Sequence, residues 1–293
     1  MGPIGPHDSG LYHLQTIQWL SSFPIVPGLG NLHGRLAFNN AIFLYNAALN
    51  ISIWSNKTHH LANGVLLLIF YARIGLSLSR LLLKKSTFQG LDLFLLLLIP
   101  AIINLSFRQA STTHTGFSLW LIGLIIGVEL WYLLYDNSLT SKRMFEIVFT
   151  IVLLSSVGVA IKLSFIGFGF LSSVIALFVW LRANFEGFNI SEKIRKTVLF
   201  SLPPILILVP WIIRSVILSG YIAFPNTMTV IKKDWRVPVK TAIDYERKIK
   251  AWAKQPGVDP KIVLENSNWI KPWIKEKIKY KFDIILPVIM FIS

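Results

Sequence analysis

Residues 144–161 read MFEIVFTIVLLSSVGVAI, and this run indicates the fold class of the chain. It contains one charged residue and approaches the roughly 20 apolar residues that a helix needs to cross a bilayer. Similar runs lie near residues 60–83, 91–107, 116–135, 164–183 and 197–219. The sequence therefore predicts an all-α, polytopic transmembrane helix bundle with about six complete spans.

The composition agrees with a membrane protein. Of the 293 residues, 54% are hydrophobic and only 15% are charged, whereas soluble domains carry about 25% charged residues. The net charge is +15, but the basic residues flank apolar runs and no nucleic-acid motif is present, so nucleic acid is not an expected partner. The chain has no cysteine, which excludes disulfides and thiolate chemistry.

The short loops set an orientation for the bundle. Basic residues gather in every second connection, which is the pattern of loops on the inner side of a membrane. These residues are Lys84, Lys85, Lys142, Arg143, Arg182, Lys193, Arg195 and Lys196. The remaining connections are then expected to face outward: residues 1–59, residues 108–115, the turn at Lys162, and residues 220–280.

This topology divides the chain into four parts. Residues 1–59 are expected to form a first external loop, with one helix at 11–21 and an amphipathic, interfacial helix at 36–54. Residues 60–219 form the bundle, and residues 220–280 form a basic, Trp-rich external segment with a helix that Gln255-Pro256-Gly257 ends. Residues 281–293 resemble the start of a truncated span. We therefore expect a fragment that lacks a span before Asp8 and several after Ser293.

Asp8 is the acid that stands out in the first external loop. Apart from Asp92, which lies at an inner span end, it is the only acid among the first hundred residues. It could take a proton from an attacking hydroxyl or amine as a general base. It could equally cap the helix expected at 11–21, and the sequence leaves both interpretations open.

Several basic groups share the predicted outer face with Asp8. Arg35, Arg108 and Lys162 could bind phosphate, or they could snorkel to the membrane interface as anchors. Interfacial anchoring is the favoured interpretation for Arg214. His13 and His33 are candidates to support a phosphate site. Their spacing fits no zinc pattern, so no metal site and no cofactor are predicted, and a divalent metal has no support in the residues.

Two charged residues, Arg73 and Glu129, lie inside predicted spans. Intramembrane charges usually pair or line a cavity. We expect Arg73 and Glu129 to approach each other as a structural pair, with a proton path as the alternative.

A set of motifs gives the chain a resemblance to a known class of protein. The motifs are DSGLYHLQ at residues 8–15, VPGLGNLHGRLAFN at 26–39, IKLS at 161–164, PWIIR at 210–214, SGY at 219–221 and DWRVP at 234–238. With these stretches the sequence resembles bacterial integral membrane glycosyltransferases of the GT-C class. The resemblance covers nearly the whole chain, and the opening motif is its most specific part.

The resemblance implies a function and a location. It implies transfer of a sugar from a polyprenyl-phosphate donor to an envelope glycan or lipid acceptor, at the outer face of a bacterial plasma membrane. The acceptor-activating acid would be Asp8, and Lys162 and Arg35 would contact the donor phosphate. One departure is the second external loop, RQASTTHT at residues 108–115, which carries no acid where relatives often have one.

Two other functions fit a polytopic chain of this kind. A transporter or flippase of lipid-linked saccharides would need polar residues through the whole membrane depth, whereas here they cluster on the predicted outer side. An inactive fragment that acts only as a membrane scaffold would need no site at all.

Overall fold

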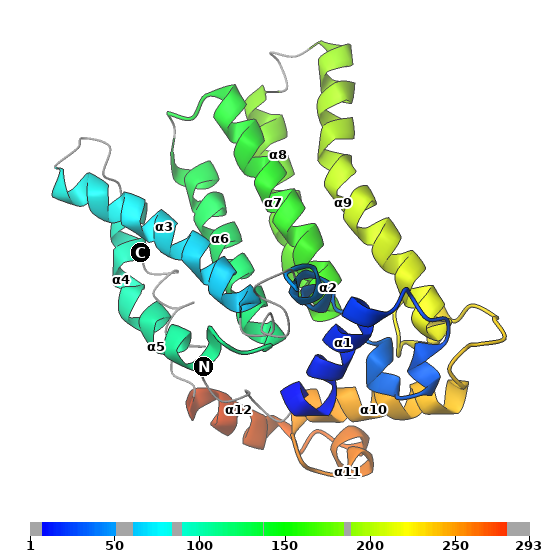
Figure 1. Ribbon diagram of the computed structural model, residues 1–293. Helices are drawn as coiled ribbons and strands as arrows, with labels where there is room; N and C mark the ends of the chain where they lie inside the picture. Colours follow the sequence, from blue (N-terminus) through cyan, green and yellow to red (C-terminus); the bar gives the residue numbers. More distant parts are fainter. Residues whose placement is uncertain (1–7, 51–60, 84–89, 137, 185–188, 280–293) are drawn as a thin grey trace.

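The computed structural model describes residues 8–50, 61–83, 90–136, 138–184 and 189–279, and the described residues are helical with no strand beyond one isolated bridge between Tyr221 and Val230. Five helices are long and apolar enough to cross a membrane (Figure 1). They are α3 (Ala62–Leu82), α6 (Thr115–Tyr135), α7 (Ser141–Ile161), α8 (Ile166–Asn184) with its leading 3-10 turn η6 (Leu163–Phe165), and α9 (Ile190–Ser219). The predicted all-α polytopic bundle is therefore confirmed.

Helix α7 lies at the centre of the bundle and packs against α6, α8 and α9. Its core positions include Ile147, Val148 and Ile151, which are at most 1% exposed. Small residues let α8 approach closely, because a Cβ on Gly169 would lie 3.2 Å from the Cβ of Ser155 in α7. Such close contact between small residues is a usual way for helices to pack in lipid.

The predicted span at 91–107 is two helices instead of one. Helix α4 (Gly90–Leu97) ends before Leu98, and α5 (Ile99–Gln109) begins with Pro100 in its first turn. A proline inside a helix lacks the N–H donor and clashes with the carbonyl four residues earlier, so it breaks the ladder at this point. The described part of the chain thus has five continuous spans and one broken apolar segment, where we had predicted six spans.

Side-chain caps explain where several helices begin. Thr140 accepts from the backbone N–H of Arg143 at the start of α7. Asn189 and Glu192 form a reciprocal capping box at the start of α9, which places the beginning of this helix seven residues before the apolar run that predicted it. Caps of this kind satisfy the free N–H groups of a first turn.

The N-terminal segment lies across one end of the bundle (Figure 1). It contains a π-helical turn η1 (Ser9–His13), α1 (Leu14–Ser22), the 3-10 turns η2 (Leu29–Asn31) and η3 (Gly34–Ala37), and α2 (Ala41–Ala48). The helix predicted at 11–21 is thus present, with a start two residues earlier. The helix predicted at 36–54 is shorter and spans only Ala41–Ala48. Phe43 of this helix is fully buried, because α2 packs on α1 and α7. Residues 51–54 lie outside the described residues.

The segment after α9 returns along the same end of the molecule. It forms the 3-10 turn η7 (Thr227–Thr229), α10 (Val239–Lys254), α11 (Pro260–Glu265) and α12 (Ile270–Lys279), and α10 stops where Gln255-Pro256-Gly257 predicted. Buried residues of η3, of the chain after α9 and of α10 form a small core, made of Ala37, Tyr221, Phe224, Val237 and Ala242. The truncated span predicted at 281–293 lies outside the described residues.

Candidate functional site

Asp8 forms an ion pair with Arg35. The Arg35 Nη1 donates to Asp8 Oδ1 over 3.0 Å, which joins the start of η1 to η3. Asp8 stands at the N-cap position of η1, but its side chain makes no capping hydrogen bond, so the interpretation of Asp8 as a helix cap is wrong. Its backbone is already helical, and the carboxylate therefore reaches away from the turn towards Arg35. The Asp8 side chain remains 55% exposed, which leaves it accessible to a substrate.

Tyr12 lies beneath the guanidinium of Arg35. The Arg35 Cζ stands 5.3 Å from the centre of the Tyr12 ring, within the range of a cation–π contact. Burial, together with the charge of Asp8, raises the pKa of Tyr12 to about 12. The phenol therefore stays protonated, and Tyr12 supports Arg35 through the face of its ring.

His13 is buried directly behind this pair, with 3% of its surface exposed. Its Nδ1 shares a hydrogen bond of 2.9 Å with the hydroxyl of Thr113, and that hydroxyl also contacts Ser9 Oγ at 2.9 Å. Burial lowers the pKa of His13 to about 4, with the Asp8 charge opposing this shift. A neutral imidazole offers no charge to a phosphate, so His13 acts here by hydrogen bonding to the loop before α6.

The same loop carries His114, which lies between the charges of Asp8 and Lys162. His114 is the residue before α6, and Lys162 is the residue after α7. Burial lowers the pKa of His114, the charge of Lys162 lowers it further, and the charge of Asp8 opposes both. His114 therefore lies within electrostatic range of both Asp8 and Lys162, and the exposed Lys162 shares this end of the bundle with the Asp8–Arg35 pair.

The other predicted residues lie elsewhere. His33 is exposed and lines a pocket against α10. Arg108 lies in α5, and its side chain is outside the part of the chain that the structure describes. Arg214 is 8% exposed and donates to Asn39 Oδ1, so it is not an anchor at the lipid interface. Among the described residues, no three His, Asp or Glu side chains gather where they could hold a metal ion.

Sequence reasoning missed three residues of this site: Ser9, Tyr12 and Thr113. Ser9 and Tyr12 belong to the opening motif, and their place beside the candidate acid was the available signal. Thr113 meets Ser9 and His13 across about a hundred residues of chain, and no local pattern encodes such a contact.

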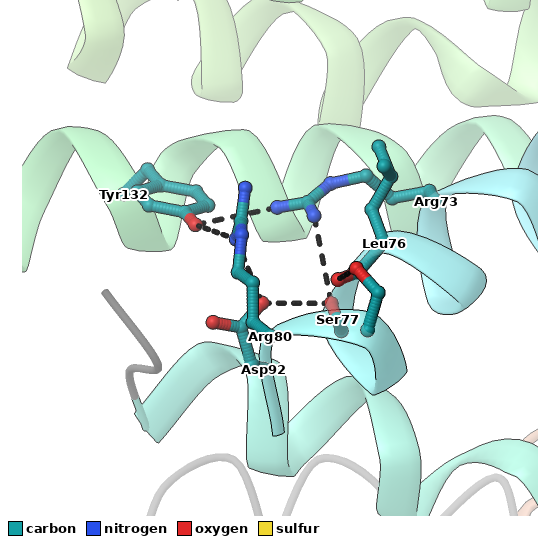
Figure 2. Close-up of polar contacts among 7 residues, drawn as sticks. Arg73, Leu76, Ser77, Arg80, Asp92 and Tyr132 are labelled. Atoms are coloured by element: carbon teal, nitrogen blue, oxygen red, sulfur yellow. Dashed lines mark hydrogen bonds and ion pairs between the residues drawn. The ribbon is translucent and has the colours of Figure 1, made fainter. Parts of the chain in front are cut away.

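Figure 2 shows a second polar cluster. It lies near the C-terminal ends of α3 and α6, at the opposite end of the bundle. Asp92 of α4 is fully buried and accepts from Arg80 Nη1 at 3.0 Å and from Ser77 Oγ at 2.7 Å. The Tyr132 hydroxyl of α6 accepts from Arg80 at 3.4 Å and from Arg73 at 3.3 Å. These contacts tie α3, α4 and α6 together at the end where the chain has its basic loops.

The expected pair of Arg73 and Glu129 is realised only in part. Glu129 lies within electrostatic range of Arg73 and Arg143, but within the described residues no ion pair joins it to Arg73. The guanidinium of Arg73 turns instead to Tyr132, one helical turn further along α6, and to Ser77. The acid that sequence reasoning left unpaired, Asp92, takes the ion pair with Arg80.

The first cluster has the features of a reactive site, and the second has those of a structural joint. In the first cluster an accessible carboxylate stands beside Arg35, with Lys162 nearby, so it can hold a proton and stabilise negative charge. In the second cluster the carboxylate is buried and satisfied by two donors. Asp8 is therefore the candidate for chemistry.

The fold defines a class, the multi-pass helical membrane proteins, because five described helices can span a bilayer. Within this class, residues 3–293 match the family described as a domain of unknown function, DUF8201, so the chain belongs to that family. No curated protein and no solved structure matches the chain.

Proposed function

We propose that the protein is a membrane glycosyltransferase that moves a sugar from a polyprenyl-phosphate donor to a glycan or lipid acceptor. The observation that carries the proposal is the accessible carboxylate of Asp8, held by Arg35 at the end of the bundle that Lys162 also occupies. The resemblance to GT-C glycosyltransferases supplies the substrate class. The same resemblance supplies the bacterial plasma membrane as the location, and the alternating basic loops support an orientation with this end facing outward.

In the proposed reaction, Asp8 removes the proton from the acceptor hydroxyl. The acceptor oxygen then bonds to the anomeric carbon of the donor sugar, while the bond from that carbon to the lipid-phosphate oxygen breaks. The electron pair stays on the leaving phosphate, and attack from the opposite face inverts the anomeric centre. Arg35 and Lys162 are the groups that would stabilise the charge on the phosphate.

The contact between Asp8 and Arg35 is compatible with both roles. Arg35 holds the carboxylate through a single nitrogen, Nη1, and a guanidinium carries five N–H donors in all. The cation can therefore orient the base and contact a phosphate from the same position. Because the pair is exposed to solvent, it is weak in stability terms, and its separation would cost little.

The test compares sugar transfer by membranes that contain the wild-type protein with transfer by membranes that contain the Asp8→Asn variant. The amide introduced by this substitution could still accept from Arg35 but could not take a proton, so transfer from a labelled polyprenyl-phosphate sugar should fall about a hundredfold or more. The exposed acid Asp244 gives a matched control, and Asp244→Asn should transfer at the wild-type rate. Undiminished transfer by Asp8→Asn contradicts the assignment. Movement of lipid-linked saccharide across vesicles without any transfer would favour the flippase function instead.

A further inference from the structure

A pocket lies between the N-terminal segment and α10, and its lining reaches Gly34, the residue before Arg35. Its volume is about 340 Å³, at the small end of the range for ligand sites, roughly 300–1,000 Å³. One wall is the glycine-rich stretch from Gly30 to Gly34, and the other is the chain that leads into α10. The lining residues are Gly30, Asn31, Leu32, His33, Gly34, Val237, Pro238, Thr241 and Tyr245.

Two glycines allow the walls of the pocket to meet. A Cβ on Gly34 would stand 2.2 Å from Cε2 of Tyr245, and a Cβ on Gly30 would stand 2.8 Å from Val237 Cγ2. The Tyr245 ring is fixed from other sides too, since it packs edge-on against Phe38 with 6.1 Å between ring centres. The glycines therefore bring the backbone of one wall directly against the side chains of the other.

Hydrogen bonds hold the far wall in place. Asn31 Nδ2 donates to the carbonyl of Trp235 over 2.7 Å. The Val237 N–H donates to Ser219 O over 2.9 Å, and the Tyr221 hydroxyl donates to Val237 O over 3.0 Å. Val237 itself is fully buried. The pocket is thus formed before any ligand binds, which lowers the entropic cost of binding.

The lining chemistry points to a neutral, hydroxylated ring. Among the residues that the structure describes, no Asp, Glu, Lys or Arg lines the pocket, so these residues offer no charged side chain to neutralise a phosphate or a carboxylate. Asn31, His33 and Thr241 supply hydrogen-bonding side chains, while Pro238 and Tyr245 supply apolar surface. A lipid chain needs a uniformly apolar groove, whereas a sugar ring has polar edges and apolar faces and matches this mixture.

The lining of the pocket also adjoins the Asp8–Arg35 pair along the chain. Gly34 lines it, and the next residue, Arg35, holds the carboxylate of Asp8. We infer that the pocket between residues 30–34 and α10 binds a saccharide unit of the acceptor and directs its hydroxyl towards Asp8. That the bound saccharide belongs to the acceptor rests on the proposed function, whereas saccharide binding rests on the pocket itself.

The experiment measures binding of free sugars to the purified full chain by saturation-transfer NMR. The probes are glucose, galactose, mannose and N-acetylglucosamine, each titrated to tens of millimolar. The detergent must lack a sugar headgroup, because a maltoside would compete for the site. His33→Ala and Thr241→Val each remove one hydrogen-bonding group, so each should lower the affinity for the sugar about fivefold. Asp244→Asn, on an exposed residue of α10 outside the lining, should leave binding unchanged.

The outcomes separate this inference from the proposed function. Sugar binding that is weakened in His33→Ala and Thr241→Val, but kept in Asp8→Asn, supports the pocket whether or not transfer is ever observed. If no probe binds, or if these two variants bind as the wild type does, the inference is overturned. In that case transfer that depends on Asp8 would still uphold the proposed function. Thermal unfolding of each variant in the same detergent checks that the fold is intact.

Discussion

The guanidinium of Arg214, in α9, donates to the side-chain oxygen of Asn39, at the end of the motif that carries Arg35. The Asn39 amide donates in turn to the Trp211 carbonyl, and the Trp211 indole donates to the Asn39 carbonyl. Arg214 is only 8% exposed, and within the described residues it has no carboxylate partner. A single asparagine therefore joins the N-terminal segment to α9 through a buried cation.

Asn39→Ala should destabilise the protein by about 3 kcal/mol, because a buried charge loses its acceptor. Thermal unfolding in detergent, compared with wild type, measures this loss. The exposed Asn104 of α5 provides the control, and Asn104→Ala should change little. The double variant Asn39→Leu with Arg214→Met should recover most of the stability, since apolar groups can replace both partners at small cost. Equal unfolding temperatures for Asn39→Ala and Asn104→Ala would contradict this role.

The buried histidine gives the protein a predictable response to acid. The pKa of His13 is lowered to about 4 by burial, while an unfolded histidine titrates near 6.5. Between these values the unfolded state binds more protons, so the free energy of unfolding rises with pH. The contribution is complete above about pH 6.5 and is lost as the pH falls towards 4, at a cost of about 3 kcal/mol.

His13→Gln removes this titration, so the unfolding free energy of the variant should depend less on pH between about 4 and 6.5. Chemical denaturation at a series of pH values measures both proteins. His114, whose pKa is also lowered by burial, retains a slope of the same sign in the variant. Parallel profiles for wild type and His13→Gln would show that His13 titrates normally in the folded protein.

Most of the bundle could be predicted from the apolar runs. In lipid, a single segment can satisfy all its backbone hydrogen bonds internally only as a helix. The exceptions have local causes. Pro100 divides one run into α4 and α5, and the capping box at Asn189 extends α9 through a charged turn that hydropathy does not recognise. Both signals are present in the sequence, but the span boundaries were predicted from the apolar runs alone.

The sequence predicts which residues belong to the candidate site but not how they contact one another. Asp8 and Arg35 were both named from the opening motifs, yet their ion pair depends on the turns η2 and η3, which fold the chain back over 27 residues. The contact of His13 with Thr113 depends on how η1 docks against the loop before α6. Such long-range contacts follow from packing, which periodicity does not describe.

The ion pair of Asp92 should contribute more to the stability of the protein than the charge of Arg73 does. Asp92→Asn leaves Arg80 without its buried carboxylate, so it should cost about 3 kcal/mol of stability. Among the described residues, Arg73 donates only to two neutral hydroxyls, at 3.3 and 3.5 Å, and its Cζ lies 5.7 Å from the centre of the Tyr132 ring. Arg73→Gln should therefore cost about 1 kcal/mol or less. Thermal unfolding in detergent ranks the two variants. A larger loss for Arg73→Gln would mean that Glu129 pairs with Arg73 more closely than the structure shows.

Gly28 should tolerate no other residue without a loss of stability. Its φ is +70°, which strains any L side chain, and an added Cβ would stand 2.7 Å from the backbone oxygen of Trp235. Gly28→Ala therefore combines a backbone strain of about 1–2 kcal/mol with a clash against backbone. The contact of Asn31 with Trp235 would be lost as the two segments separate. Gly257 is the matched control, since its φ is +80° but an added Cβ meets nothing within 4 Å.

Limited proteolysis distinguishes these two glycines. In Gly28→Ala the chain around Trp235 should come loose, and trypsin should cut after the exposed Lys232 and Lys233 faster than in wild type. In Gly257→Ala only the backbone strain is present, so cleavage at these lysines should stay at the wild-type rate, with a loss of stability of about 1–2 kcal/mol. Equal protection of both variants at Lys232 and Lys233 would mean that the contact between Gly28 and Trp235 does not hold the two segments together.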